Sequence, residues 1–296
     1  MTCGYLNKSA GDNFAVIPET RIADFSLLFM KYQGIYFMKK TLIALTVAAS
    51  AAISGSAMAW TPNGNGGSVQ LSGMLTPDVK VTPWEVKVGD AVKGLDAKIN
   101  KGQKTVDIAV TKTIPILGIR TQTAEVFHGQ AGITPQISYG NAVKTDSFSK
   151  GSAPLTLEVK DSTGVKIGTA ETSIVAAAAS SYVDTAGHKI YSLYASKSGY
   201  GFFGGVGKSA DAVASNPNVV ADNILAEARK HYNNQGYYIN PEPGQITFDI
   251  KDASYSAYYV SGIEKDKTIK ITLDDAACGD APIQWKASLP IIVSYM

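Results

Sequence analysis

The chain has 296 residues, of which 45% are hydrophobic and 18% charged, and its formal net charge is +2. Such an apolar fraction can bury a core, which excludes a disordered tail, and the small net charge argues against a basic nucleic-acid-binding protein. The two cysteines are too few for a disulfide scaffold or a four-thiolate zinc site.

Residues 38–59 have the pattern of a Sec-type signal peptide. Met38 is followed by two lysines, residues 42–53 are mostly apolar, and the small residues at 57–59 resemble a cleavage site. The apolar stretch is too short for a transmembrane anchor, and polar residues interrupt it. We therefore expect the chain to be exported and cleaved after Ala59.

A signal peptide acts only at an amino terminus, so residues 1–37 are interpreted as a mis-annotated upstream extension and Met38 as the true start. Amino-terminal sequencing of the exported protein should then give Trp60. Residues 60–296 carry 22 basic and 22 acidic side chains, so the expected mature protein has no net charge. It keeps one cysteine, Cys278, which is either buried or able to pair between molecules.

Alternation of apolar and polar residues predicts β-strands through most of the mature chain, because side chains at period two point to opposite faces. The predicted strands cover residues 69–75, 106–110, 155–159, 246–250, 269–273 and 289–295. Turn-forming residues separate them. Many short strands of this kind favour a β-sandwich.

Residues 180–244 interrupt this pattern and are interpreted as an insertion between sandwich strands. Asn216 and Pro217 have the types preferred at a helix start, and Gly236 has the type preferred after a helix end. An apolar face between them predicts a helix over 217–234. Long insertions with structure of their own are often functional.

Two predicted strands suggest a function in assembly. The strand near the mature amino terminus has one apolar face, formed by Val69, Leu71, Gly73 and Leu75. Such a segment is either donated to a neighbouring molecule or is an ordinary first strand. The other is the carboxy-terminal strand, where the chain ends with a potentially open sheet edge and alternating residues Leu289, Ile291, Val293 and Tyr295.

Motifs for catalysis or cofactor binding are weak. Residues 199–204 match G-x-G-x-x-G, but the predicted helix starts more than ten residues later, so a close-packed glycine loop is the preferred interpretation. The three histidines are not spaced as ligands with each other or with Cys278, and there is no G-x-S-x-G nucleophile motif. We expect no catalytic residues, no metal site and no cofactor, which leaves a secreted β-sandwich enzyme as the disfavoured alternative.

An ordered set of short segments resembles the FaeG-type major fimbrial subunits of enterotoxigenic Escherichia coli, which are chaperone–usher pilins. The segments are MKKTLIAL at 38–45, WEVKVG at 84–89, PILG at 115–118 followed by RT at 120–121, PQI at 135–137, SLY at 192–194, FFGG at 202–205 and the ending from QW at 284–285. They follow the same order through nearly the whole mature chain.

The resemblance implies a mostly β fold, an incomplete immunoglobulin-like β-sandwich completed by donor-strand exchange, with a helix-containing insertion. Residues 60–78 would be the donor-strand extension and residues 79–296 the pilin domain. Val69, Leu71, Gly73 and Leu75 would enter the groove of the next subunit, and the strand with Leu289, Ile291, Val293 and Tyr295 would border the groove and bind the chaperone. The implied partners are identical subunits head to tail, a periplasmic chaperone and an outer-membrane usher, with export through the periplasm to a fimbrium on the cell surface.

The resemblance also implies adhesion through a galactose-containing host glycoconjugate bound in the insertion. Tyr194 matches the family's aromatic residue beside the sugar, and Tyr200, Phe202 and Phe203 are further candidates because aromatic faces can stack on sugar rings. The family's nearby arginine has no counterpart here. Core packing is the other interpretation of each aromatic residue, and a non-adhesive structural or minor pilin without a ligand is the alternative function.

Overall fold

The computed structural model describes residues 62–63, 71–74 and 81–296. The chain divides into two units, Met1–Thr76 and Pro77–Met296, and the fold described below is that of the second unit. The predicted signal peptide, residues 1–37, Val69 and Leu75 lie outside the described residues.

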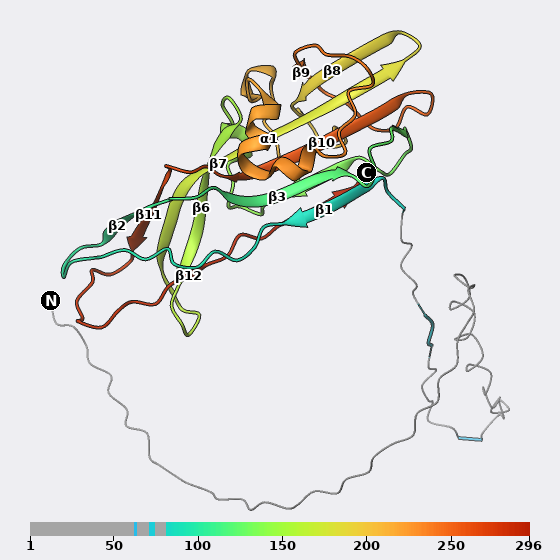
Figure 1. Ribbon diagram of the computed structural model, residues 1–296. Helices are drawn as coiled ribbons and strands as arrows, with labels where there is room; N and C mark the ends of the chain where they lie inside the picture. The colour runs from blue at the N-terminus through green and yellow to red at the C-terminus, as the bar shows by residue number, and fades with distance from the viewer. Residues whose placement is uncertain (1–61, 64–70, 75–80) are drawn as a thin grey trace, which may run out of the picture. The chain divides into compact units, whose positions relative to one another are not determined.

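Strands dominate the second unit, as expected from the alternation (Figure 1). They are β1 (Trp84–Val88), β2 (Thr105–Ala109), β3 (Ile114–Thr121), β4 (Phe127–His128), β5 (Pro135–Ser138), β6 (Ser152–Lys160), β7 (Lys166–Asp184), β8 (Gly187–Leu193), β9 (Glu242–Gly244), β10 (Ser254–Ile263), β11 (Thr268–Leu273), β12 (Lys286–Ala287) and β13 (Ile292–Tyr295). The helical elements are η1 (Thr145–Ser147), η2 (Ala210–Ala212), α1 (Pro217–Leu225) and η3 (Ala226–Arg229).

The 19-residue strand β7 organises the main sheet. Its first half pairs with β6 on one side and β11 on the other, and its second half pairs with β8 and β10. The sheet path runs β1-β3-β10-β7-β11-β2, while β13 and β5 form a separate two-stranded sheet. The fold is mostly β and fits an immunoglobulin-like sandwich with a helical insertion, as predicted.

Apolar side chains from both halves of β7 and from its neighbours fill the main core. The largest fully buried members are aromatic, and three of them, Phe202, Phe248 and Tyr259, contact one another or Trp84 through ring edges and faces. Tyr139 and Tyr259 share a hydrogen bond of 2.8 Å between their hydroxyls, which satisfies both polar atoms inside the core.

Helix α1 packs over β7 and β10 (Figure 1). Small residues of β7, including Ala177 and Ala179, allow Ala221 and Ile224 of the helix to approach closely and form a second apolar cluster. Asn216 caps the helix as predicted, because its side-chain oxygen accepts hydrogen bonds from the backbone N–H groups of Asn218 and Val219.

The helix is shorter than the predicted 217–234, because α1 ends at Leu225 and η3 ends at Arg229. Leu225 leaves the helical conformation with φ −157° and reaches the surface of β3, where its side chain lies against Gly118. The contact of Leu225 with the sheet therefore ends the helix before the apolar pattern in the sequence ends.

The predicted strand at 246–250 is wrong, although its alternation is real. Ile246 and Phe248 are buried, but the backbone forms no sheet ladder there. Instead, Phe248 accepts a hydrogen bond from the Gln130 N–H, and Ile246 accepts one from the Gly201 N–H. These single contacts with separate loops bury the same side chains without a strand.

Candidate functional site: an open groove and an aromatic loop

An apolar groove of about 1460 Å³ runs along one side of the sandwich. Its floor consists of side chains from β2, β3, β6, β7, β10 and β11, and most of them are aliphatic. They are Val106, Ile108, Ile114, Ile116, Leu155, Leu157, Ala170, Thr172, Ile263, Ile269, Ile271 and Leu273. A continuous aliphatic floor is suited to an apolar face, and the charged residues that line the groove, such as Lys93, Asp96 and Lys98, lie on its rims.

Two extended segments form the rims of this groove. One is the stretch 89–101 that follows β1, and the other is the stretch 279–291 that contains β12. Within the described part of the chain, residues 90–99 and 288–291 have no strand partner and no backbone–backbone hydrogen bond. Each rim therefore presents backbone donors and acceptors that an additional strand could satisfy.

Apolar rim residues are exposed beside the groove. Val88, Val92 and Ile283 line it and keep 55%, 46% and 44% of their surface accessible. On the first rim, the sequence alternates so that Leu95 and Ile99 are half-buried between exposed neighbours. This alternation is visible in the sequence, but the sequence analysis did not assign it to a strand or to the site.

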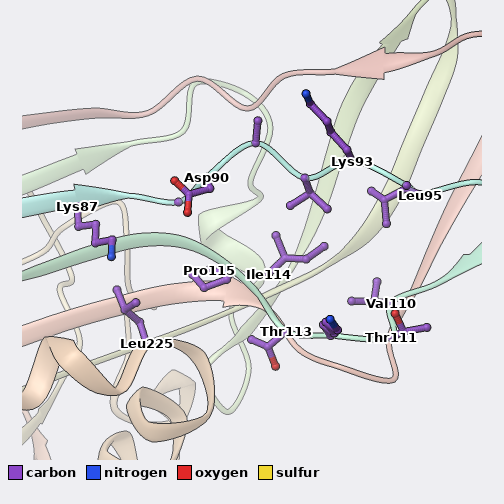
Figure 2. A pocket seen from close by; sticks show the side chains of 15 residues that line it. Lys87, Asp90, Lys93, Leu95, Val110, Thr111, Thr113, Ile114, Pro115 and Leu225 are labelled. Carbon is purple, nitrogen blue, oxygen red and sulfur yellow. The ribbon is translucent and has the colours of Figure 1, made fainter.

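A smaller cavity of about 330 Å³ lies at the same rim (Figure 2). Residues 89–95 cross it on one side, and the stretch 110–115 and Leu225 of α1 border it on the other. Both cavities border residues 90–95, so this stretch has open space beside it beyond the hydrogen bond that Gly89 forms with Ile116. It is thus placed to accept a new strand partner.

The residues of the predicted carboxy-terminal strand lie in two different environments. Leu289 and Ile291 line the groove, whereas Val293 and Tyr295 belong to β13 and pack against the main core. All four are half-buried and alternate with exposed residues, as the sequence pattern indicated. Burial raises the pKa of the Tyr295 hydroxyl, which keeps it neutral where it contacts Thr82.

Only part of the predicted donor segment is described. Residues 71–74 are not assigned to a strand, and Leu71 is 93% and Met74 87% exposed. Within its own unit this stretch therefore leaves large apolar side chains in water, which is unfavourable unless another surface covers them.

The aromatic candidates lie on the segment that follows β8. Tyr194, Tyr200 and Phe203 are half-buried, so part of each ring is accessible, and the Nζ of Lys197 lies 5.8 Å from the ring centre of Tyr200. Phe202 is fully buried and stacks on Tyr259 with ring centres 5.6 Å apart. A ligand on the surface cannot reach the Phe202 ring, so this candidate is corrected to a core residue.

Gln136 lies near these aromatic residues, and the sequence did not identify it as part of the candidate site. It is 7% exposed, and its side chain forms hydrogen bonds with three successive residues of the aromatic loop, Ser198, Gly199 and Tyr200. Nothing in the sequence distinguishes it from a surface glutamine, because its partners lie more than 60 positions away.

Other sites have little support in the described residues. No group of three or more His, Cys, Asp or Glu side chains there could hold a metal ion. Cys278 is exposed, so the buried placement that the sequence allowed is wrong. In the same part of the chain, no helix is long and apolar enough to cross a membrane.

A β-sandwich with an open apolar groove beside unpaired extended segments is able to pair with a strand of another chain. The chain matches the model of the fimbrial major and minor subunit family over residues 38–296. It belongs to this K88-type family of fimbrial subunits, which are structural proteins and not enzymes.

Curated relatives extend this result. The chain is 32% identical to K88 fimbrial protein AB of Escherichia coli over 289 residues, which cover 87% of this chain and 100% of that protein. It is 29% identical to the F41 fimbrial protein of E. coli over 292 residues, with the same coverage of both chains. The K88 minor fimbrial subunit FaeI of E. coli is 28% identical over 141 residues, or 45% of this chain and 53% of that protein. Membership of this family implies assembly with other subunits into a surface fimbrium.

Proposed function

We propose that the chain is the major subunit of a chaperone–usher fimbria and polymerises by donor-strand exchange. The observation that carries the proposal is the apolar groove with two rims whose backbone groups have no partner in the described residues. A strand placed between 89–101 and 288–291 would extend both rims and cover the aliphatic floor.

The donor in this proposal is the segment with Val69, Leu71, Gly73 and Leu75 of the neighbouring subunit. Covering each of the three large side chains contributes about 1.5–3 kcal/mol to the contact between subunits. Before assembly the groove would need a temporary occupant, because an open apolar edge aggregates. A periplasmic chaperone lending a strand beside Leu289 and Ile291, and an outer-membrane usher where the exchange takes place, fill these roles.

A pair of substitutions in the donor segment tests the assembly proposal. Leu71→Asp places a charge on the face that enters the groove, whereas Gln70→Asp places it on the opposite face. We expect Leu71→Asp to abolish fibres on the cell surface while the chaperone complex is still formed, and Gln70→Asp to leave fibres intact. Fibres of normal length from Leu71→Asp, counted by electron microscopy, would refute strand donation.

We further propose that the subunit mediates adhesion by binding a galactose-containing host glycoconjugate at Tyr194, Tyr200 and Phe203. The partly accessible rings of these residues offer stacking surface, and Lys197 places a charged group beside Tyr200. The similarity to a minor subunit, FaeI, favours keeping the non-adhesive structural or minor pilin as the second candidate.

Glycan-array binding by strand-complemented protein separates these two functions. The adhesin proposal predicts binding that is lost in Tyr194→Ala and Tyr200→Ala and kept in Tyr238→Ala, which removes an exposed ring elsewhere in the insertion. An array without any bound glycan would leave the structural subunit as the function.

A further inference from the structure

The loop 197–205 is fastened to the edge of β5 by the side chain of Gln136. The Oε1 atom accepts hydrogen bonds from the Gly199 N–H at 3.0 Å and from the Ser198 hydroxyl at 3.3 Å. The Nε2 atom donates to the Tyr200 carbonyl at 3.0 Å. One buried amide thus binds three successive loop residues, and losing it would leave several polar groups of the loop without partners.

Backbone contacts add to this connection. The Phe202 N–H donates to the Pro135 carbonyl, and the Ile137 N–H donates to the Phe203 carbonyl, both at 2.8 Å. Gly204 has φ +81°, and a Cβ atom there would lie 2.0 Å from the Ile137 carbonyl oxygen. The last glycine of the G-x-G-x-x-G match, Gly204, therefore allows the loop to approach β5 closely, which is a packing role and not a sign of a nucleotide site.

The opposite edge of β5 pairs with β13, which continues directly from the groove rim at 288–291. Beyond β13, Met296 exchanges two backbone hydrogen bonds of 3.0 Å with Thr134. The Ser198 hydroxyl also lies 3.1 Å from the Met296 sulfur. A continuous series of hydrogen-bonded elements therefore connects the groove rim, β13, β5 and the aromatic loop.

We propose that Gln136 is a positioning residue through which the occupancy of the groove controls the order of the loop 197–205. A strand in the groove fixes residues 288–291, which fixes β13 against β5 and strengthens the hold of Gln136 on Ser198, Gly199 and Tyr200. This inference rests on the proposed strand-receiving role of the groove. By reciprocity, a ligand that orders Tyr200 and Phe203 stabilises the inserted strand by the same factor.

Hydrogen exchange measured by mass spectrometry tests this coupling in the full exported chain. Leu71→Asp is included to prevent self-polymerisation, and a synthetic peptide of residues 65–77 is added in excess. A peptide carrying Leu71→Asp and Leu75→Asp is the control. We expect the natural peptide to protect both rims and to slow exchange of the amides at 198–204 about fivefold or more, whereas the control peptide does neither.

Substitutions then test the role of Gln136. In Gln136→Leu, the loop should exchange rapidly with or without the peptide, while the rims are still protected. Ser198→Ala removes only one hydroxyl from the connection and should reduce the effect without unfolding the chain. Gln235→Leu is the matched control, because the Gln235 amide also donates to a backbone carbonyl, that of Ser254, but its side-chain partners lie on β7 and β10 and not on the connection, so it should respond as the parent does.

The outcomes separate the two levels of the proposal. If the peptide slows amide exchange in the rims of the parent chain but not in the loop, the coupling is overturned, while the proposal that the groove binds a strand still stands. If the peptide slows exchange in the loop of Gln136→Leu and Ser198→Ala as much as in the parent, Gln136 is not the residue that carries the coupling. Rims that stay unprotected at saturating peptide would overturn both the strand-receiving groove and this inference.

Discussion

Neighbouring aromatic residues of one loop have opposite environments. Phe202 has φ +61°, a left-handed conformation that turns its ring into the core, while Tyr200 and Phe203 on either side keep part of their rings accessible. Such a conformation is uncommon for a bulky residue and persists only when surrounding contacts enforce it. Here the hydrogen bond from the Phe202 N–H to Pro135 and the stacking on Tyr259 supply those contacts.

This difference predicts separate effects on stability. Phe202→Ala should lower the free energy of unfolding by about 3–5 kcal/mol, because it leaves a cavity in the main core. Tyr200→Ala should lower it by less, because the Tyr200 ring is only half-buried against the core. Urea denaturation of the strand-complemented protein measures both, and equal losses in the two variants would contradict the assignment.

The partly buried imidazole of His188 predicts that the stability of the folded protein depends on pH. Its ring stacks on Tyr237 with centroids 3.5 Å apart, and burial lowers its pKa in the folded state. In the unfolded chain the His188 imidazole binds a proton at its ordinary pKa of about 6.5, whereas in the folded state it binds that proton only at lower pH. Stability should therefore fall as the pH drops from the ordinary pKa toward the lowered one.

His188→Phe keeps an aromatic ring for stacking but cannot titrate. We expect its urea midpoint to vary less between about pH 7.5 and pH 5 than that of the parent. His128→Gln changes an exposed histidine and serves as the control, which should follow the parent. Identical pH profiles for His188→Phe and the parent would exclude His188 as the source.

At the scale of elements, the insertion depends on a short helix with a well-formed start. Asn216→Ala removes the acceptor for the N–H groups of Asn218 and Val219 and should cost about 1 kcal/mol. Asn216→Ser retains an acceptor and should cost much less. Amide exchange at Asn218 and Val219 locates the effect, and equal protection in all three proteins would contradict the capping role.

Local patterns predicted only some of the strands and the start of the helix, and they did not predict the contacts that join the elements. Alternation found β2, β6, β11 and the inward face of the carboxy-terminal strand, and residue preference found the cap at Asn216. The same rules extended the helix past Leu225 and predicted a strand at 246–250, because periodicity does not show which partner buries a side chain. The Gln136 contacts with the loop are created by chain folding over more than 60 positions, so a single sequence carries no signal for them.

At the scale of the whole molecule, the groove and the donor segment are different surfaces of one chain. A contact between different surfaces is heterologous, and repeated head to tail it produces a filament whenever its rotation does not close a ring. In the proposed mechanism each subunit therefore lacks one strand of its own sandwich and receives that strand from its neighbour. The balanced charge of residues 60–296 fits such a fibre, because strongly charged copies would repel one another at every contact.

The most direct test of this account mixes two defective forms of the exported protein. One carries Leu71→Asp, so it has a working groove and no usable donor, and the other carries Leu289→Asp at the groove rim with an intact donor. Neither should polymerise alone, and together they should form a one-to-one complex that does not grow, as measured by size-exclusion chromatography with light scattering. Fibres from either form alone, or no complex from the mixture when each form is folded, would contradict assembly by strand donation.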